Sequence, residues 1–234
     1  MRCSTRNVAA LLSIVVAGAA CTAWASGGGS MDMPSSPSSM QDAAPAPEEK
    51  AVVAYDAGVA LIKRADEALT DADAATDIKK QQKAHEHAKK YFGKAQKKFE
   101  SAVELNPDMY QAWNYVGYSK RNLGDYNGAL EAYDRALALN PRYLEAIEYR
   151  GHAYLGLNRI DDAKQAYLDL FASNPVLARK LLSAMQAWVG SHRDDAQGVA
   201  QSVIEDFAKW VDERDGIAAN TMNLVPTGNA GVWH

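Results

Sequence analysis

Residues 112–141 have the sequence AWNYVGYSKRNLGDYNGALEAYDRALALNP, and residues 146–175 repeat its pattern as AIEYRGHAYLGLNRIDDAKQAYLDLFASNP. Four features recur at a constant spacing of about 34 residues, called here the repeat period. The pairs are Gly117 and Gly151, Ala129 and Ala163, Tyr133 and Tyr167, and Asn140-Pro141 and Asn174-Pro175. An unbroken period of this length, with small residues at fixed places and Asn-Pro at each end, predicts stacked helical hairpins.

The first copy predicts two helices, at about residues 109–122 and 126–139, with Gly124-Asp125 in the turn between them. Gly117 and Ala129 are small enough to let the two helices approach closely. Larger apolar residues at helical spacing fill the space around them: Trp113, Val116, Leu130, Tyr133 and Leu137. Neither helix can bury its apolar face alone, so the next hairpin must cover it.

This stretch resembles the tetratricopeptide repeat. The residues that carry the resemblance are Trp113, Gly117, Gly124, Tyr126, Ala129, Tyr133, Ala136 and Pro141. The resemblance implies an all-α fold, a right-handed solenoid of helical hairpins. It also implies an interaction module rather than a catalyst.

A divergent repeat is predicted at residues 50–109. Ala95, Phe99 and Ala102 lie one repeat period before Ala129, Tyr133 and Ala136, and Gly58 takes the place that Gly117 fills later. We expect helices at 50–72 and at about 77–105. They are longer than those of the later repeats, so they should project beyond the stack.

The resemblance implies two tetratricopeptide repeats at residues 110–175, and capping helices are predicted at 176–214. We expect the first cap helix to run from Pro175 to about Val189, ended by Gly190, and the second to span 194–214. Their apolar residues follow the same pattern at a fixed spacing and are predicted to share one buried face: Leu177, Leu181, Leu182, Met185, Trp188 and Val189, then Val199, Val203, Ile204, Phe207, Trp210 and Val211. A partner-binding helix is the alternative. Residues 215–234 are predicted to be disordered.

The N-terminus predicts export. Arg2 and Arg6 precede an uncharged apolar run that ends in Ala23-Trp24-Ala25, so residues 1–25 are predicted to be a signal peptide. The chain then resembles an exported bacterial protein of the tetratricopeptide repeat family, located in the periplasm or secreted. The alternative is a membrane-anchored lipoprotein with a lipidated Cys21. Residues 26–49, rich in Gly, Ser, Pro and Ala, predict a disordered linker.

Both cysteines, Cys3 and Cys21, precede the predicted cleavage site. The mature chain would then have no thiol, which excludes disulfides, Cys nucleophiles and Cys-based metal sites. Loss of Arg2 and Arg6 would move the formal net charge from −4 to −6. This acidic balance makes nucleic acid an unexpected partner.

No catalytic, cofactor or metal site is predicted. His85 and His87 lie two residues apart on a helix and point about 160° away from each other, so they do not form a metal pair. The chain carries no phosphate-binding glycine loop and no nucleophile elbow. We therefore expect a protein that is not an enzyme.

The resemblance places a partner-binding groove along the first helix of each repeat. The corresponding positions are Gln111, Asn114, Tyr118, Arg121 and Asn122, followed by Glu145, Glu148, His152 and Leu155. Tyr118 and His152 stand where family members that clamp a terminal carboxylate have Asn. The mixed lining predicts an exported, non-enzymatic protein–protein interaction scaffold that binds a peptide or protein segment.

The helix at 77–105 carries a row of lysines, here called the lysine stripe. Its members are Lys79, Lys83, Lys90, Lys94 and Lys97, and they fall within about 60° of each other around the helix. The stripe is either a solvated face or a surface that meets an anionic partner such as lipid headgroups. The alternative function is therefore an envelope assembly factor, a lipoprotein held at the membrane by a lipidated Cys21 or by the lysine stripe.

Overall fold

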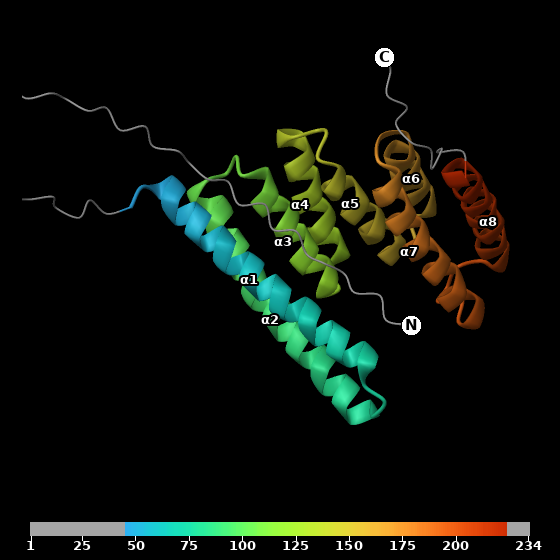
Figure 1. Ribbon diagram of the computed structural model, residues 1–234, viewed down its shortest axis with the longest axis horizontal. Coiled ribbons are helices and arrows are strands. Elements are labelled where there is room, and N and C mark those ends of the chain that lie inside the picture. The colour runs from blue at the N-terminus through green and yellow to red at the C-terminus, as the bar shows by residue number, and fades with distance from the viewer. Residues whose placement is uncertain (1–44, 224–234) are drawn as a thin grey trace, which may run out of the picture. The chain divides into compact units, whose positions relative to one another are not determined.

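The computed structural model describes residues 45–223, and its regular structure there is entirely α-helical (Figure 1). The helices of this range are α1 (Pro47–Ala74), α2 (Ile78–Leu105), α3 (Tyr110–Asn122), α4 (Tyr126–Leu139), α5 (Leu144–Gly156), α6 (Ile160–Ser173), α7 (Pro175–Asp194) and α8 (Gln201–Asn223). Each helix packs against the next one in the chain, and α5 also contacts α3 and α7. The predicted signal peptide and most of the predicted linker lie outside the described residues.

The second helix of each repeat ends at an Asn-Pro junction with one recurring geometry. The backbone N–H groups of Asn106 and Asn140 each donate to the carbonyl four residues earlier, at 2.9 Å. The side-chain Oδ1 atoms of Asn106, Asn140 and Asn174 accept from the N–H two residues later, at 3.2, 3.2 and 3.1 Å. The Asn side chain therefore supplies an acceptor for an N–H group just after the proline, where the chain leaves the helix.

Close helix contacts occur at the predicted glycines. A Cβ atom at Gly117 would lie 2.6 Å from the Tyr133 ring, and one at Gly58 would lie 2.6 Å from the Phe99 ring. Gly58 is thus the equivalent of Gly117 in the first hairpin. Gly151 differs, because its nearest neighbour is Leu181 of α7, also at 2.6 Å. The packing of the stack therefore changes at the second full repeat.

The first hairpin is much longer than the others. Both α1 and α2 have 28 residues, whereas α3 has 13 and α4 has 14. Figure 1 shows the α1–α2 pair extending past the ends of α3 and α4. Phe92, Ala95 and Phe99 of α2 are buried against the stack. The predicted projection is confirmed.

The helix bounds differ from the prediction at both ends of the described chain. The first helix begins at Pro47, inside the predicted linker. The last helix runs from Gln201 to Asn223, not from 194 to 214, so the predicted disorder of residues 215–223 is wrong. Residues 224–234 lie outside the description. Of the expected apolar face, Val199 precedes α8, and Val203 is 42% exposed.

The prediction that Gly190 ends its helix is also wrong, because α7 continues to Asp194. His192 is buried and stacks on the Trp188 ring at 3.7 Å, which favours a helical backbone through this segment. The chain turns instead at Gln197 and Gly198, whose φ angles are 46° and 81°. Tertiary packing outweighs the roughly 1 kcal/mol cost of a glycine inside a helix.

Candidate functional site

The sequence-predicted groove residues come from α3 and α5, and α1 continues the same side of the stack. On α3, Asn114 is buried, whereas Gln111, Tyr118, Arg121 and Asn122 are half-buried. On α5, Glu148 is buried, Leu155 is buried in the core, His152 is half-buried and Glu145 is exposed.

A hollow of about 380 Å³ lies beside these residues, between α1 and α3. Tyr115 of α3 lines it together with residues of α1: Val59, Ile62, Lys63, Asp66, Glu67 and Thr70. The hollow extends the groove onto the first hairpin, although no α1 residue was among the predicted site residues.

Four aromatic side chains run across this side of the stack and are called here the tyrosine row: Tyr55 of α1, Tyr115 and Tyr118 of α3, and Tyr149 of α5. The ring centroids lie 5.8 Å apart for Tyr55 and Tyr115, 6.2 Å for Tyr115 and Tyr118, and 5.0 Å for Tyr118 and Tyr149. These are ordinary aromatic contact distances. The row therefore links three successive hairpins, and its members are all partly accessible.

Tyr118 joins the first hairpin to the second. Its hydroxyl donates to Asp66 Oδ1 of α1 at 3.2 Å. Burial raises the pKa of Tyr118 to about 12, and the Asp66 charge adds to the rise. Burial also raises the pKa of the Asp66 carboxyl, which the Tyr118 hydrogen bond and the Arg121 charge oppose. Both groups therefore favour their neutral forms more than they would in water.

Arg121 lies against two rings of the row. Its guanidinium carbon is 5.2 Å from the Tyr118 ring centroid and 5.9 Å from that of Tyr149. Both distances lie within cation–π range. Arg121 thus helps to hold Tyr118 and Tyr149 together across the junction between α3 and α5.

His152 does not repeat the contact made by Tyr118, although the two positions are equivalent in the repeat. Its Nε2 lies 2.7 Å from Glu148 Oε1 on the same helix. The Glu148 side chain is only 6% exposed, so this contact gives a buried carboxylate its partner. The two equivalent positions therefore make different contacts: Tyr118 binds a residue of another helix, whereas His152 binds one of its own helix.

Two carboxylates, Asp66 and Glu145, act on the middle of the tyrosine row. The negative charges of Asp66 and Glu145 both raise the pKa of Tyr115, after the larger effect of burial. Glu145 also acts on Tyr143, whose pKa is raised chiefly by burial. Tyr115 and Asp66 line the same hollow, and the charge of Glu145 on α5 also acts on Tyr115. This arrangement favours a positively charged group over the ring.

Sequence reasoning missed Tyr55, Tyr115, Asp66 and Tyr149. Tyr115 and Tyr149 are themselves one repeat period apart, so the repeat carried a signal for both. The Asp66 contact gave no comparable signal, because it depends on how far the first hairpin extends alongside α3.

The lysine stripe lies apart from the groove residues, on α2. All five of its members, Lys79, Lys83, Lys90, Lys94 and Lys97, are exposed. A small hollow of about 100 Å³ opens on this helix and is lined by His87, Lys90, Tyr91 and Lys94.

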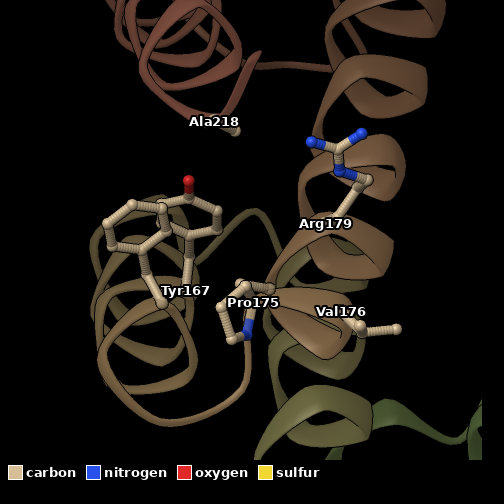
Figure 2. Close-up of a pocket in the computed structure, with 7 residues that line it drawn as sticks. Tyr167, Pro175, Val176, Arg179 and Ala218 are labelled. Atoms are coloured by element: carbon tan, nitrogen blue, oxygen red, sulfur yellow. The ribbon is translucent and has the colours of Figure 1, made fainter. Parts of the chain in front are cut away.

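A third, more apolar hollow lies near the C-terminal end of the described chain. It has a volume of about 170 Å³, and it is lined by Tyr167, Phe171, Pro175, Val176, Ala178, Arg179 and Ala218. Figure 2 shows Tyr167 of α6 and Arg179 of α7 on opposite sides, with Ala218 of α8 above them. A cavity of about 150 Å³ suffices for one benzene ring, so the hollow has the size of a single apolar side chain.

Within residues 45–223, no group of three His, Cys, Asp or Glu side chains is placed to hold a metal ion. The same part of the chain contains no helix long and apolar enough to cross a membrane.

The tetratricopeptide repeat family model matches residues 110–143. Among solved structures, the chain is similar to the TPR domain of Arabidopsis OM64, with 15% identity over 58% of this chain and 96% of that one, and a TM-score of 0.41. It is also similar to the first TPR of Spaghetti (RPAP3), solved with the HSP90 peptide SRMEEVD, at 19% identity over 61% and 95% of the two chains and a TM-score of 0.41. No curated protein matches the chain.

The matched residues form α3, α4 and the turn that follows them. The glycine–aromatic contact of this hairpin recurs between Gly58 and Phe99 in the first hairpin. The predicted fold class, an all-α right-handed helical-hairpin solenoid with C-terminal capping helices, is confirmed. Residues 110–143 are therefore a tetratricopeptide repeat, set within a chain of helical hairpins.

Proposed function

We propose that this chain is an exported, non-enzymatic scaffold that binds a peptide or protein segment in the groove along α1, α3 and α5. The tyrosine row is the observation that carries the proposal. It presents partly accessible rings from three successive hairpins beside a hollow of about 380 Å³. Tyrosines offer large contact areas at a low cost in conformational entropy, and they are enriched where proteins bind each other.

The ligand we propose carries a basic side chain. Tyr115 shares a hollow with Asp66 and also feels the charge of Glu145, so a Lys or Arg of the ligand would meet an aromatic ring in a negatively charged surrounding. Arg121 is already engaged by Tyr118 and Tyr149. It therefore serves better as a support for the groove wall than as a free site for an acidic ligand.

Photo-crosslinking tests this proposal. A photo-crosslinking residue at Glu145, which is exposed on α5, should capture a segment bound in the groove. The same residue at Glu131, exposed on α4, is the matched control on the other helix layer. A partner that crosslinks through position 145, and not through 131, supports the groove. Equal crosslinking from both positions would place the binding surface elsewhere.

Substitutions of the groove wall give an independent prediction. Changing Tyr115 or Arg121 to Ala should weaken binding of the captured partner by about 1–3 kcal/mol. The reason is that the ligand loses contacts to an aromatic ring, or the charged group that supports the rings is lost. Arg135→Ala is the control, since Arg135 is exposed on α4. Affinity for the crosslinked partner, measured by calorimetry, is the readout. Unchanged binding by both groove variants, with an intact helical spectrum, would contradict the proposal.

Export is proposed from the N-terminal sequence, with the mature chain in the periplasm or secreted. Mass spectrometry of the mature N-terminus tests it. A chain beginning at Ser26 supports a soluble exported scaffold, whereas an acylated Cys21 supports the membrane-anchored lipoprotein and assembly factor. A chain that keeps Met1 would overturn both.

A further inference from the structure

Lysines are concentrated on one side of α2, in a set larger than the stripe. The set, called here the lysine face, spans seven residues that are all exposed: Lys79, Lys80, Lys83, Lys90, Lys94, Lys97 and Lys98. At 100° per residue they fall within about a 100° sector of the helix, over a length of roughly 28 Å. Glu86 lies at the edge of this sector.

The ammonium groups of the lysine face are not paired with carboxylates of the described residues at ion-pair distance. Among the ion pairs between described residues, none includes a lysine of α2. Helix α2 has eight Lys against three Glu, whereas α1 has seven acidic residues against three basic ones. The two helices of the hairpin therefore carry opposite net charge, within a chain whose overall formal charge is −4.

The lysine face also contains a concave point. The hollow of about 100 Å³ is lined by His87, Lys90, Tyr91 and Lys94, and Lys94 Nζ lies 5.9 Å from the Tyr91 ring centroid. Two ammonium groups, an imidazole and a phenol thus border one small space. These are donors suited to the oxygens of a phosphate group.

We propose that the lysine face binds the phosphate-bearing surface of an anionic lipid bilayer, with α2 lying along it. A straight helix presents its charges in a nearly flat row, which matches a planar array of headgroups. The apolar side chains Phe92 and Phe99 are buried in the fold, so binding is electrostatic and involves no insertion. The anionic bilayer would repel the acidic helix α1. This repulsion sets the rotation of the hairpin on the membrane.

This surface is separate from the groove, and its failure would leave the proposed function untouched. No residue of the lysine face lines the hollow between α1 and α3. A chain bound to a membrane through α2 would keep its groove available for a protein segment.

Vesicle co-sedimentation with the full chain tests the proposal. The chain should bind vesicles of phosphatidylcholine with phosphatidylglycerol and should not bind phosphatidylcholine alone. A triple variant should bind the anionic vesicles about tenfold or more weakly, since each lysine near the surface contributes to the attraction. It combines Lys83→Gln, Lys90→Gln and Lys94→Gln. Lys50→Gln, Lys180→Gln and Lys209→Gln combined is the matched control, because these three lysines are exposed on other helices.

Other occupants give other results. Equal binding of the original chain to both vesicle types overturns the proposal, as does equal loss in the two triple variants. Inorganic phosphate at matched ionic strength could displace the chain from the vesicles. That result would assign the hollow to a free anion and overturn the proposed membrane binding. The chain could instead fail to bind vesicles and form a salt-sensitive dimer. If only the triple variant at Lys83, Lys90 and Lys94 abolished that dimer, the lysine face would be assigned to a second copy of the chain.

Discussion

Gly117 shows how one residue sets the spacing of a hairpin. Without a side chain, it lets the Tyr133 ring lie directly on the α3 backbone, and Tyr133 is fully buried there. Gly58 and Phe99 repeat the contact one hairpin earlier. In both hairpins the ring fills the space that a Cβ would need, so the choice of glycine is steric and not a matter of backbone flexibility.

Changing Gly117 to Ala should therefore destabilise the fold by about 1–3 kcal/mol, because the new methyl group overlaps a ring that has no room to move. Gly93→Ala is the control: no atom lies within 4 Å of the corresponding Cβ, and the residue is inside α2. That variant should be stabilised by roughly 0.5–1 kcal/mol. Chemical denaturation measures both, and equal stability of the two variants would contradict the packing described.

The positions of the groove candidates in the fold could be predicted only in part. Tyr118 and Glu148 lie where the repeat places them, since both belong to the regular hairpins. Asp66 escaped prediction because the length of the first hairpin, and not the repeat, brings it to Tyr118. The opposite error occurred at His152, whose equivalence to Tyr118 in sequence does not extend to its hydrogen bond with Glu148.

Helix existence was predictable throughout the described chain, and helix ends were predictable where side chains cap them. Asp125 accepts from the Gly128 N–H at 3.0 Å and starts α4 at the expected residue. The end of α7 was not predictable from local sequence. Gly190 signals a stop, but His192 stacks on Trp188, and Trp188 in turn contacts Phe207 of α8.

Gly190→Ala tests this account of α7. The residue is exposed and helical, and a Cβ there would meet no atom within 4 Å. Alanine should stabilise the protein by roughly 0.5–1 kcal/mol, as expected for the interior of a helix. Thermal unfolding followed by circular dichroism gives the comparison. A loss of stability would show that this glycine ends a helix, as the sequence alone indicates.

Across the whole molecule, tyrosine burial couples the fold to alkaline pH. The pKa values of Tyr55 and Tyr118 are raised to about 12, and burial also raises those of Tyr115, Tyr133, Tyr143, Tyr149 and Tyr167. A raised pKa in the folded state means that the stabilisation is complete below the unfolded value near 10. It is lost as the pH rises through the folded values.

We therefore expect the melting temperature to fall steeply between about pH 10 and pH 12, with tyrosinate absorbance appearing together with the loss of helix. Tyr133→Phe keeps the buried ring and removes one ionisable group, so it should move the alkaline transition to higher pH. Tyrosinate formation by most tyrosines near pH 10, with the helical signal intact, would contradict this coupling.

The length of the first hairpin has a consequence for local unfolding. Between residues 67 and 87, around the turn that joins α1 to α2, Ala72 is the one residue in the buried class. So thin a core should open without the rest of the solenoid, since local stability follows buried apolar contact. Amide hydrogens of this tip should exchange with solvent much faster than those around Phe99 and Tyr133, and unfolding of the protein should begin there.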